Sequence, residues 1–272
     1  MDESYFAEEP AFTKVESLFL RGRNILLTRA DLAPLMDQWR DHISRNHLEL
    51  PVELKGMFQR ALACFALHCV SRPRRQTLSW TINFQEPLVN MFLVGDTDED
   101  SVAGRIFVDN VAESERNNFY QEIGKRGQDP YRSYIDFESR DPLVAAEEFY
   151  RRSEQRPARF FALSETRYVM LSAHPDWDRD WFHSIGEDDV FTLDEKEDLH
   201  DIESRKVKWE CGCSDQRIFA ALAPIFSHSP DELFGGDPII TVNCPRCSAK
   251  FGITREAMEG WMAQQNDSSQ SA

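Results

Sequence analysis

Four cysteines near the C-terminus are the residues of this chain best suited to chemistry. Cys211 and Cys213 form a C-x-C pair, Cys244 and Cys247 form a C-x-x-C pair, and thirty residues separate the two pairs. Thiolates are soft ligands, and four of them suit the tetrahedral coordination of a structural zinc ion. The spacing therefore predicts a four-cysteine site that holds about one zinc ion per chain.

The residues inside the two pairs fit such a site. Gly212 carries no side chain that would obstruct the path between the first two sulfurs. Pro245 fixes φ within the second pair, so less entropy is lost when the metal binds. The run from Cys244 to Gly252 resembles the turn of a zinc knuckle, in which backbone amides stabilise the sulfur charge.

Two other interpretations of these cysteines stay open. They could be four unrelated thiols, or they could form a catalytic zinc site with an open position, in which His228 replaces one thiol. We favour the structural site because both pairs lie in one short segment with few core residues. Cys64 and Cys69 lie far away in the chain, and five helical residues turn them about 140° apart, so we predict two separate core thiols.

The elements that must position these residues alternate irregularly between strands and helices. We expect helices over 28–43, 51–70, 113–125 and 142–155 in the first part of the chain, and over 214–225 and 230–234 between the cysteine pairs. We expect extended segments over 15–27, 77–84, 88–94, 105–111, 131–137, 159–163, 167–172 and 238–242. Because no regular strand–helix–strand alternation is present, the sequence predicts an α+β fold.

The sequence also predicts four regions. Residues 1–172 form a mixed strand and helix core domain, 173–208 an acidic connector, 209–262 a four-cysteine zinc domain, and 263–272 a disordered tail. The connector holds twelve acidic residues against five basic ones, so its net charge is −7 and it is poorly equipped to bury a core of its own. Its large aromatic residues are Trp177, Trp181, Phe182 and Phe191.

Charge and hydropathy limit the partners and the location. The formal net charge of −16 disfavours nucleic acid and anionic membranes as partners. The N-terminus MDESYFAEEP has neither the basic nor the apolar part of a secretory signal, and the longest apolar run, 61–70, is too short to span a membrane. We therefore expect a cytoplasmic protein with reduced thiols. The basic run Arg72–Arg75 is interpreted as a solvated turn rather than an anion site.

The cysteine pattern resembles that of the 33-kDa heat-shock protein family, the redox-regulated holdase chaperones. A second match is the segment Glu147–Pro157, which is similar to the family's helix ending in Ser-Glu-Gln-x-Pro, here Ser153, Glu154 and Gln155. Two segments depart from the family pattern: 83–87 lacks the usual glycine-rich turn, and the connector is shorter and more acidic. The resemblance covers most of the chain.

The resemblance implies a chaperone that needs no ATP, is not an enzyme and binds unfolding client proteins. It implies that oxidation joins Cys211 to Cys213 and Cys244 to Cys247, releases zinc and loosens the connector, with a possible homodimer in the oxidised state. An alternative is a constitutive zinc-stabilised interaction module that has lost oxidative activation. A zinc hydrolase is a third candidate, although the sequence contains no HExxH, nucleophile elbow or P-loop.

Overall fold

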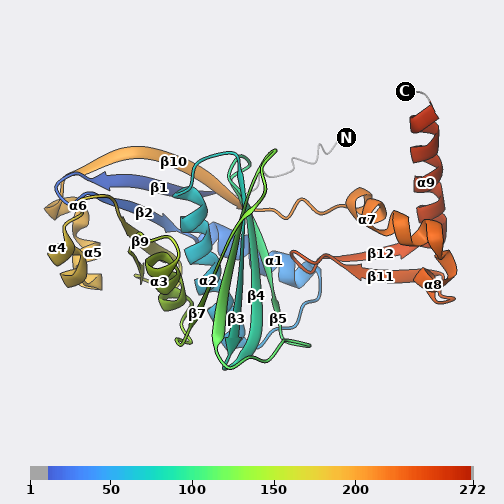
Figure 1. Ribbon diagram of the computed structural model, residues 1–272, viewed down its shortest axis with the longest axis horizontal. Coiled ribbons are helices and arrows are strands. Elements are labelled where there is room, and N and C mark those ends of the chain that lie inside the picture. Colours follow the sequence, from blue (N-terminus) through green and yellow to red (C-terminus); the bar gives the residue numbers. More distant parts are fainter. Residues whose placement is uncertain (1–11, 271–272) are drawn as a thin grey trace, which may run out of the picture.

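The structure is a computed structural model that describes residues 12–270. Residues 1–11, which include the N-terminal sequence discussed above, and residues 271–272 lie outside the described part. Twelve strands and nine helices are present within it, and the strands form one sheet of ten and one hairpin (Figure 1). The chain is thus a mixed α+β protein, as its sequence predicts.

The large sheet has the strand order β7-β6-β3-β4-β5-β10-β1-β2-β9-β8. Its strands are β1 (Thr13–Leu20), β2 (Ile25–Asp31), β3 (Gln76–Gln85), β4 (Leu88–Asp96), β5 (Ser101–Phe107), β6 (Asn117–Lys125), β7 (Tyr131–Phe137), β8 (Ala158–Ala162), β9 (Arg167–Ala173) and β10 (Leu199–Trp209). All pairs are antiparallel except a short parallel contact between β10 and β5, where Trp209 lies opposite Val102. This contact joins two antiparallel halves into one sheet.

Three helices belong to the first 172 residues, three to the connector and three to the C-terminal part. They are α1 (Ala33–Arg45), α2 (Val52–Val70), α3 (Pro142–Arg152), α4 (Arg179–Ser184), α5 (Glu187–Phe191), α6 (Leu193–Lys196), α7 (Asp215–His228), α8 (Pro230–Phe234) and α9 (Arg255–Gln270). The hairpin consists of β11 (Ile239–Asn243) and β12 (Lys250–Thr254).

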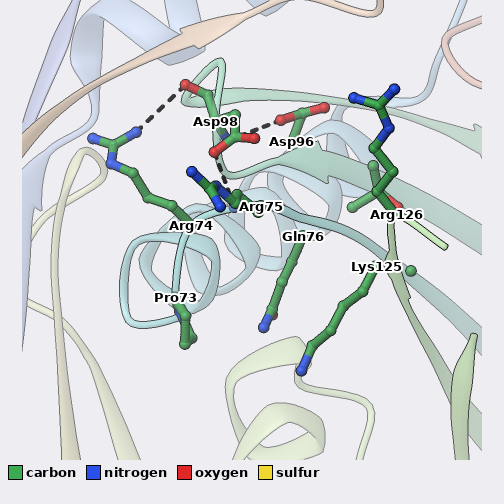
Figure 2. A pocket seen from close by; sticks show the side chains of 10 residues that line it. Pro73, Arg74, Arg75, Gln76, Asp96, Asp98, Lys125 and Arg126 are labelled. Atoms are coloured by element: carbon green, nitrogen blue, oxygen red, sulfur yellow. Dashed lines mark hydrogen bonds between the residues drawn. The ribbon is translucent and has the colours of Figure 1, made fainter. Parts of the chain in front are cut away.

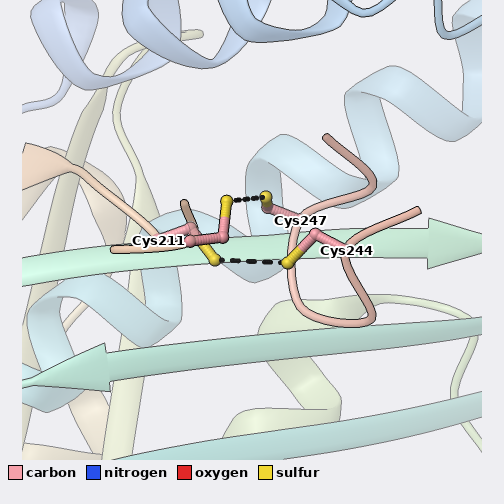
Figure 3. Close-up of side chains that lie close together, drawn as sticks. Cys211, Cys244 and Cys247 are labelled. Carbon is pink, nitrogen blue, oxygen red and sulfur yellow. Dashed lines mark hydrogen bonds between the residues drawn. The ribbon is translucent and has the colours of Figure 1, made fainter. Parts of the chain in front are cut away.

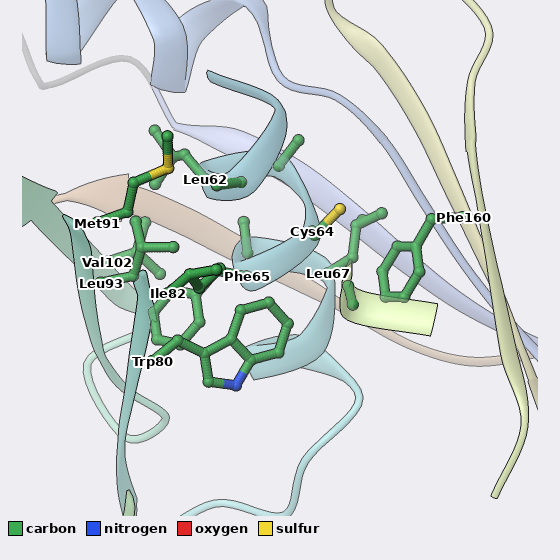
Figure 4. Packing of buried hydrophobic residues seen from close by; sticks show 14 of the residues in the cluster. Leu62, Cys64, Phe65, Leu67, Trp80, Ile82, Met91, Leu93, Val102 and Phe160 are labelled. Atoms are coloured by element: carbon green, nitrogen blue, oxygen red, sulfur yellow. The ribbon is translucent and has the colours of Figure 1, made fainter. Parts of the chain in front are cut away.

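Helix α2 is the centre of the main hydrophobic core. Every residue from Ala61 to Val70 is buried, which is the pattern of a helix enclosed on all sides. Its Phe65 packs edge-on against Trp80 of β3, with ring centroids 5.2 Å apart. Phe160 of β8 packs on the opposite side of the helix, so α2 fills the space between the two halves of the sheet (Figure 4).

The connector packs on the other face of the sheet. Phe160 and Met170 belong to the α2 core, whereas their neighbours Phe161 and Val169 belong to a second cluster that includes Phe182 of α4. Because successive strand residues point to opposite faces, α4–α6 must cover the face that α2 leaves free. Figure 1 shows these helices at the end of the molecule remote from the hairpin.

Arginines of the sheet also hold the connector. Arg23 forms ion pairs with Asp178 at 2.7 Å and with Glu197 at 3.1 Å, and Arg29 pairs with Asp194 at 2.6 Å. Exposed pairs of this kind contribute less than about 1 kcal/mol each, whereas a fully buried Phe or Leu contributes about 1.5–3 kcal/mol. The apolar cluster therefore supplies more of the attachment than the ion pairs do.

Three expectations about secondary structure are wrong. Residues 117–125 form strand β6, not a helix, because their side chains alternate between buried and half-buried positions and pair with β3 and β7. Thr28 does not begin a helix but lies fully buried in β2. The single extended segment expected over 15–27 is instead two strands, β1 and β2, separated by a turn over 21–24. Helix α9 continues as far as Gln270, and the boundary at 263 stays a prediction.

Helix α3 ends at Arg152, three residues before the predicted end, and the other predicted strands and helices occur close to their expected positions. In the described part of the chain, no helix is both long and apolar enough to cross a membrane.

Candidate metal centre

The four predicted cysteines lie together in space. The Sγ atoms of Cys211, Cys213, Cys244 and Cys247 all lie within 4.8 Å of one another. Cys211 Sγ is 3.7 Å from Cys244 Sγ, and Cys213 Sγ is 3.6 Å from Cys247 Sγ (Figure 3). A tetrahedron with zinc–sulfur bonds of about 2.3 Å has edges of about 3.8 Å, so the four sulfurs fit such an ion. Disulfide bonds of about 2.05 Å are absent, and all four are free thiols.

The second pair lies in the turn of the β11–β12 hairpin, residues 244–249, which we call the cysteine loop. Cys244 N–H donates to the carbonyl of Ala249 at 2.8 Å, and Ser248 N–H donates to the carbonyl of Cys244 at 2.9 Å. These bonds close the loop around its two sulfurs. Both side chains are buried, with Cys244 2% and Cys247 1% exposed.

The first pair lies between the end of β10 and the start of α7. Gly212 has a φ of +66°, a left-handed conformation that strains any residue with a Cβ. Gly212 is therefore needed for two reasons. It allows the left-handed backbone conformation, and it leaves the space between the two sulfurs free of a side chain, as the sequence suggests. Ser214 then caps α7 by accepting a hydrogen bond from the N–H of Arg217.

The thiols shift one another's pKa mainly through hydrogen bonds between neighbouring sulfur atoms. Hydrogen bonds donated by Cys211 and Cys247 hold the pKa of Cys244 well below its ordinary value. The bond to Cys244 raises the pKa of Cys211 to about 12, burial raises that of Cys213, and the bond to Cys211 raises that of Cys247. A bound divalent cation would compensate for the charge of four thiolates.

The remaining candidates lie outside this cluster. His228 is exposed at the last turn of α7 and is not among the clustered groups in the described part of the chain. Cys64 and Cys69 are 1% and 5% exposed within the main core, and burial raises the pKa of both thiols. The prediction that both are core thiols is thus confirmed, and a raised pKa keeps such thiols protonated.

Residues of the core that touch the cysteine loop were not predicted. His42 Nε2 in α1 donates to the carbonyl of Cys247 at 2.7 Å, and Arg105 Nη1 in β5 donates to the carbonyl of Cys244 at 3.2 Å. Cys244 and Cys247 also pack against Val94 of β4 and Ala103 of β5. The cysteine loop is therefore attached to the large sheet and to α1.

The basic run Arg72–Arg75 lies away from the cysteines and is only partly a solvated turn. Arg72 forms a largely buried ion pair with Glu154 at 2.8 Å. Arg74 and Arg75 line an open cavity of about 1010 Å³ together with Lys125 and Arg126 (Figure 2). Arg74 donates to the backbone carbonyl of Thr97, and the carboxylate of Asp98 accepts the N–H of Arg75. Arg74 and Arg75 thus bond to groups of the turn between β4 and β5.

Substitution of Gly212 should weaken the metal site. In Gly212→Ala, a Cβ at φ +66° costs about 1–2 kcal/mol and would lie 3.1 Å from Arg217 Nη1. We expect about a tenfold lower metal affinity, measured by competition with a chelator. The matched change Gly260→Ala, in helix α9 with open space around the added atom, should leave the affinity unchanged. Equal affinities for both variants would contradict the requirement for glycine at 212.

Comparisons with known proteins agree with the resemblance seen in the sequence. No protein-family model matches the chain. A "33 kDa chaperonin" from Nitrosococcus oceani is 23% identical over 164 residues, which cover 53% of this chain and 57% of that protein. The crystal structure of the 33 kDa chaperonin (heat shock protein 33 homolog) from Thermotoga maritima matches with a TM-score of 0.70 and 14% identity, over 95% of this chain and 100% of that one.

The two matches contribute differently. The structural match shows that the two proteins share a fold across nearly their whole lengths. The sequence match spans little more than half the length of the curated relative, so it says nothing about the remainder of that protein. Together they confirm the resemblance to the 33-kDa heat-shock protein family.

Proposed function

We propose that this chain is a divergent relative of the 33-kDa heat-shock protein family and an ATP-independent holdase chaperone that binds unfolding proteins and is switched by oxidation of a four-cysteine zinc site. The observation that carries the proposal is the cluster of four free thiols at tetrahedral spacing in a chain with the chaperonin fold. Cys211, Cys213, Cys244 and Cys247 would be the zinc ligands. The proposal places the protein in the cytoplasm, where thiols stay reduced.

A peroxide can supply the oxidation. One thiolate attacks a peroxide oxygen, the O–O bond breaks, and the cysteine becomes a sulfenic acid. A neighbouring thiolate then displaces the hydroxyl group, so that each disulfide consumes one peroxide and two protons and releases two waters. Cys211 borders an open cavity of about 400 Å³, which gives a small oxidant a route to the cluster.

An aggregation assay tests the function. Protein treated with peroxide should slow the aggregation of a heat-unfolded client at near-stoichiometric ratios and without nucleotide, and reduced zinc-loaded protein should not. Peroxide treatment of a Cys211→Ser and Cys213→Ser double variant should produce much weaker protection. Absence of protection in both redox states of the unmodified chain would exclude the holdase function.

Peptide mapping of the oxidised protein tests the pairing. The resemblance implies disulfides Cys211–Cys213 and Cys244–Cys247, which would let the two halves of the site separate. The two short sulfur–sulfur contacts instead join one half to the other. We expect mass spectrometry after digestion to find the pairs within each half. Finding Cys211–Cys244 and Cys213–Cys247 would mean that oxidation locks the halves together, which opposes an opening switch.

A constitutive interaction module that has lost oxidative activation is the second candidate. The observation in its favour is the connector, whose strand β10 lies inside the large sheet and whose Phe182 is buried. In that case client binding should be equal in both redox states. The four-region division of the chain and a homodimer of the oxidised form stay predictions, and gel filtration of both redox states tests the latter.

A further inference from the structure

Helix α1 presents one polar face to the cysteine site. Gln38, His42 and Asn46 follow one another at intervals of four residues, so their side chains lie along one side of the helix and of its C-terminal cap. We call these three residues the α1 platform. All three are half-buried, whereas the apolar residues of α1 point into the main core.

Each platform residue binds a different part of the metal centre. Gln38 Oε1 accepts the N–H of Trp209 at 2.7 Å, two residues before Cys211. His42 Nε2 donates to the carbonyl of Cys247 at 2.7 Å, and Asn46 Oδ1 accepts the N–H of Lys250 at 3.0 Å. The platform therefore contacts the chain that leads to the first cysteine pair and the chain that leaves the second pair, from Cys247 to Lys250.

The two cysteine pairs are thirty residues apart, and the segment between them gives little rigidity. It contributes only Ile218 and Phe234 to a small buried cluster, which Ile253 of β12 completes. Four sulfurs at tetrahedral spacing are preorganised for an ion when both halves are fixed to one support. The α1 platform, together with Arg105 beneath Cys244, is the support common to both halves.

We propose that the α1 platform is a set of positioning residues that preorganises the metal site and limits the rate of metal release. Through the same residues, loss of the metal reduces the stability of α1 within the core. The proposal rests on the proposed zinc site. It differs from a signal through the connector, because α4–α6 pack on the far half of the sheet and none of the contacts of the cysteine loop involves them.

Metal release kinetics test the platform. In the full chain carrying Gln38→Ala, His42→Ala and Asn46→Ala, transfer of zinc to a colorimetric chelator, without oxidant, should be about 10–100-fold faster because three hydrogen bonds are lost. The zinc content before chelation should stay at about one per chain. The matched control changes three exposed residues of the same helix to alanine, Asp37, Asp41 and Ser44, and should release zinc at the rate of the unmodified chain.

The outcomes separate the two proposals. Absence of zinc in the unmodified chain would overturn the proposed metal site itself. Bound zinc with equal release rates in the platform and control variants would overturn the platform alone. If the platform variant does not fold, hydrogen exchange of the unmodified chain tests the proposal instead. Removal of the metal should reduce the protection of the backbone amides of 33–45 and leave that of 179–196 unchanged. The reverse pattern would show that the loss of metal acts on the core through the connector.

Discussion

Replacing Cys244 and Cys247 together by serine should abolish metal binding and open the C-terminal part of the chain. Structural zinc contributes about 10–16 kcal/mol to the folding of small metal domains, and serine hydroxyls do not replace two thiolates. The local apolar cluster around Ile218 and Phe234 is too small to compensate. We expect metal content to fall from about one zinc per chain to none, and proteases to cleave 210–254 rapidly while the core up to Ala173 stays resistant.

The core thiols provide a matched control for this experiment. Cys64→Ala and Cys69→Ala also remove two thiols, but these residues lie in the α2 core, away from the metal centre. The control should lower the melting temperature of the core and keep the zinc content unchanged. If elemental analysis finds about one zinc per chain in the Cys244 and Cys247 variant, the four-cysteine assignment is wrong.

The cluster of four cysteines could be predicted from sequence because its thiols occur as two close pairs. Two cysteines in a C-x-C or C-x-x-C pair commonly bind the same metal ion. The two pairs alone therefore predict the cluster. The α1 platform could not be predicted in the same way. Polar residues at intervals of four on a helix usually face solvent, and only the fold shows that Gln38, His42 and Asn46 face the cysteine loop.

Buried polar residues explain why the sequence of strand β6 predicts a helix instead of a strand. Asn117, Phe119, Gln121 and Ile123 all face inward, but two of them are amides, which hides the apolar alternation of a strand. Gln121 tolerates complete burial because it accepts the indole N–H of Trp80 at 2.8 Å and donates to Glu154 at 2.9 Å. Sequence alone did not reveal these partners, which lie 41 and 33 residues away.

The same contact gives Glu154 a role in the fold. It was noted in the sequence only as part of the Ser153–Gln155 match to the chaperone family. In the structure its carboxylate joins Gln121 of β6 to Arg72 at the end of α2. A charged group this deeply placed costs free energy unless it is paired, and here both oxygens are occupied. The motif thus ties α3 to the centre of the core.

The composition of the connector predicts that it is poorly equipped to bury a core of its own. Repulsion within a segment of net charge −7 does oppose compaction, but Arg23, Arg29 and Arg159 of the sheet face its acids and carbonyls. Four connector residues, Phe182, Ile185, Val190 and Leu193, are buried on strands β1, β2, β8 and β9. The segment uses the sheet as its core, which its own composition does not reveal.

Phe182→Ala should therefore test whether the connector is a folded part of the reduced protein. Phe182 is 1% exposed and contacts the ring of Trp177 at 4.9 Å between centroids. Removing a buried phenyl ring costs about 3–5 kcal/mol, which exceeds the contribution of the exposed ion pairs of Arg23 and Arg29. We expect proteolysis of 173–198 in the reduced variant to accelerate at least a hundredfold, whereas the unmodified reduced chain should resist.

Phe191→Ala is the matched control, because Phe191 lies in the same connector but is 56% exposed. Its truncation should change stability by less than about 0.5 kcal/mol. If both variants are cleaved as fast as the unmodified chain, the connector is already open in solution and its burial against the sheet contributes nothing. If only Phe182→Ala opens it, and peroxide leaves the unmodified connector intact, then a holdase switch in this chain must act at the cysteine loop and α1, because the connector stays folded.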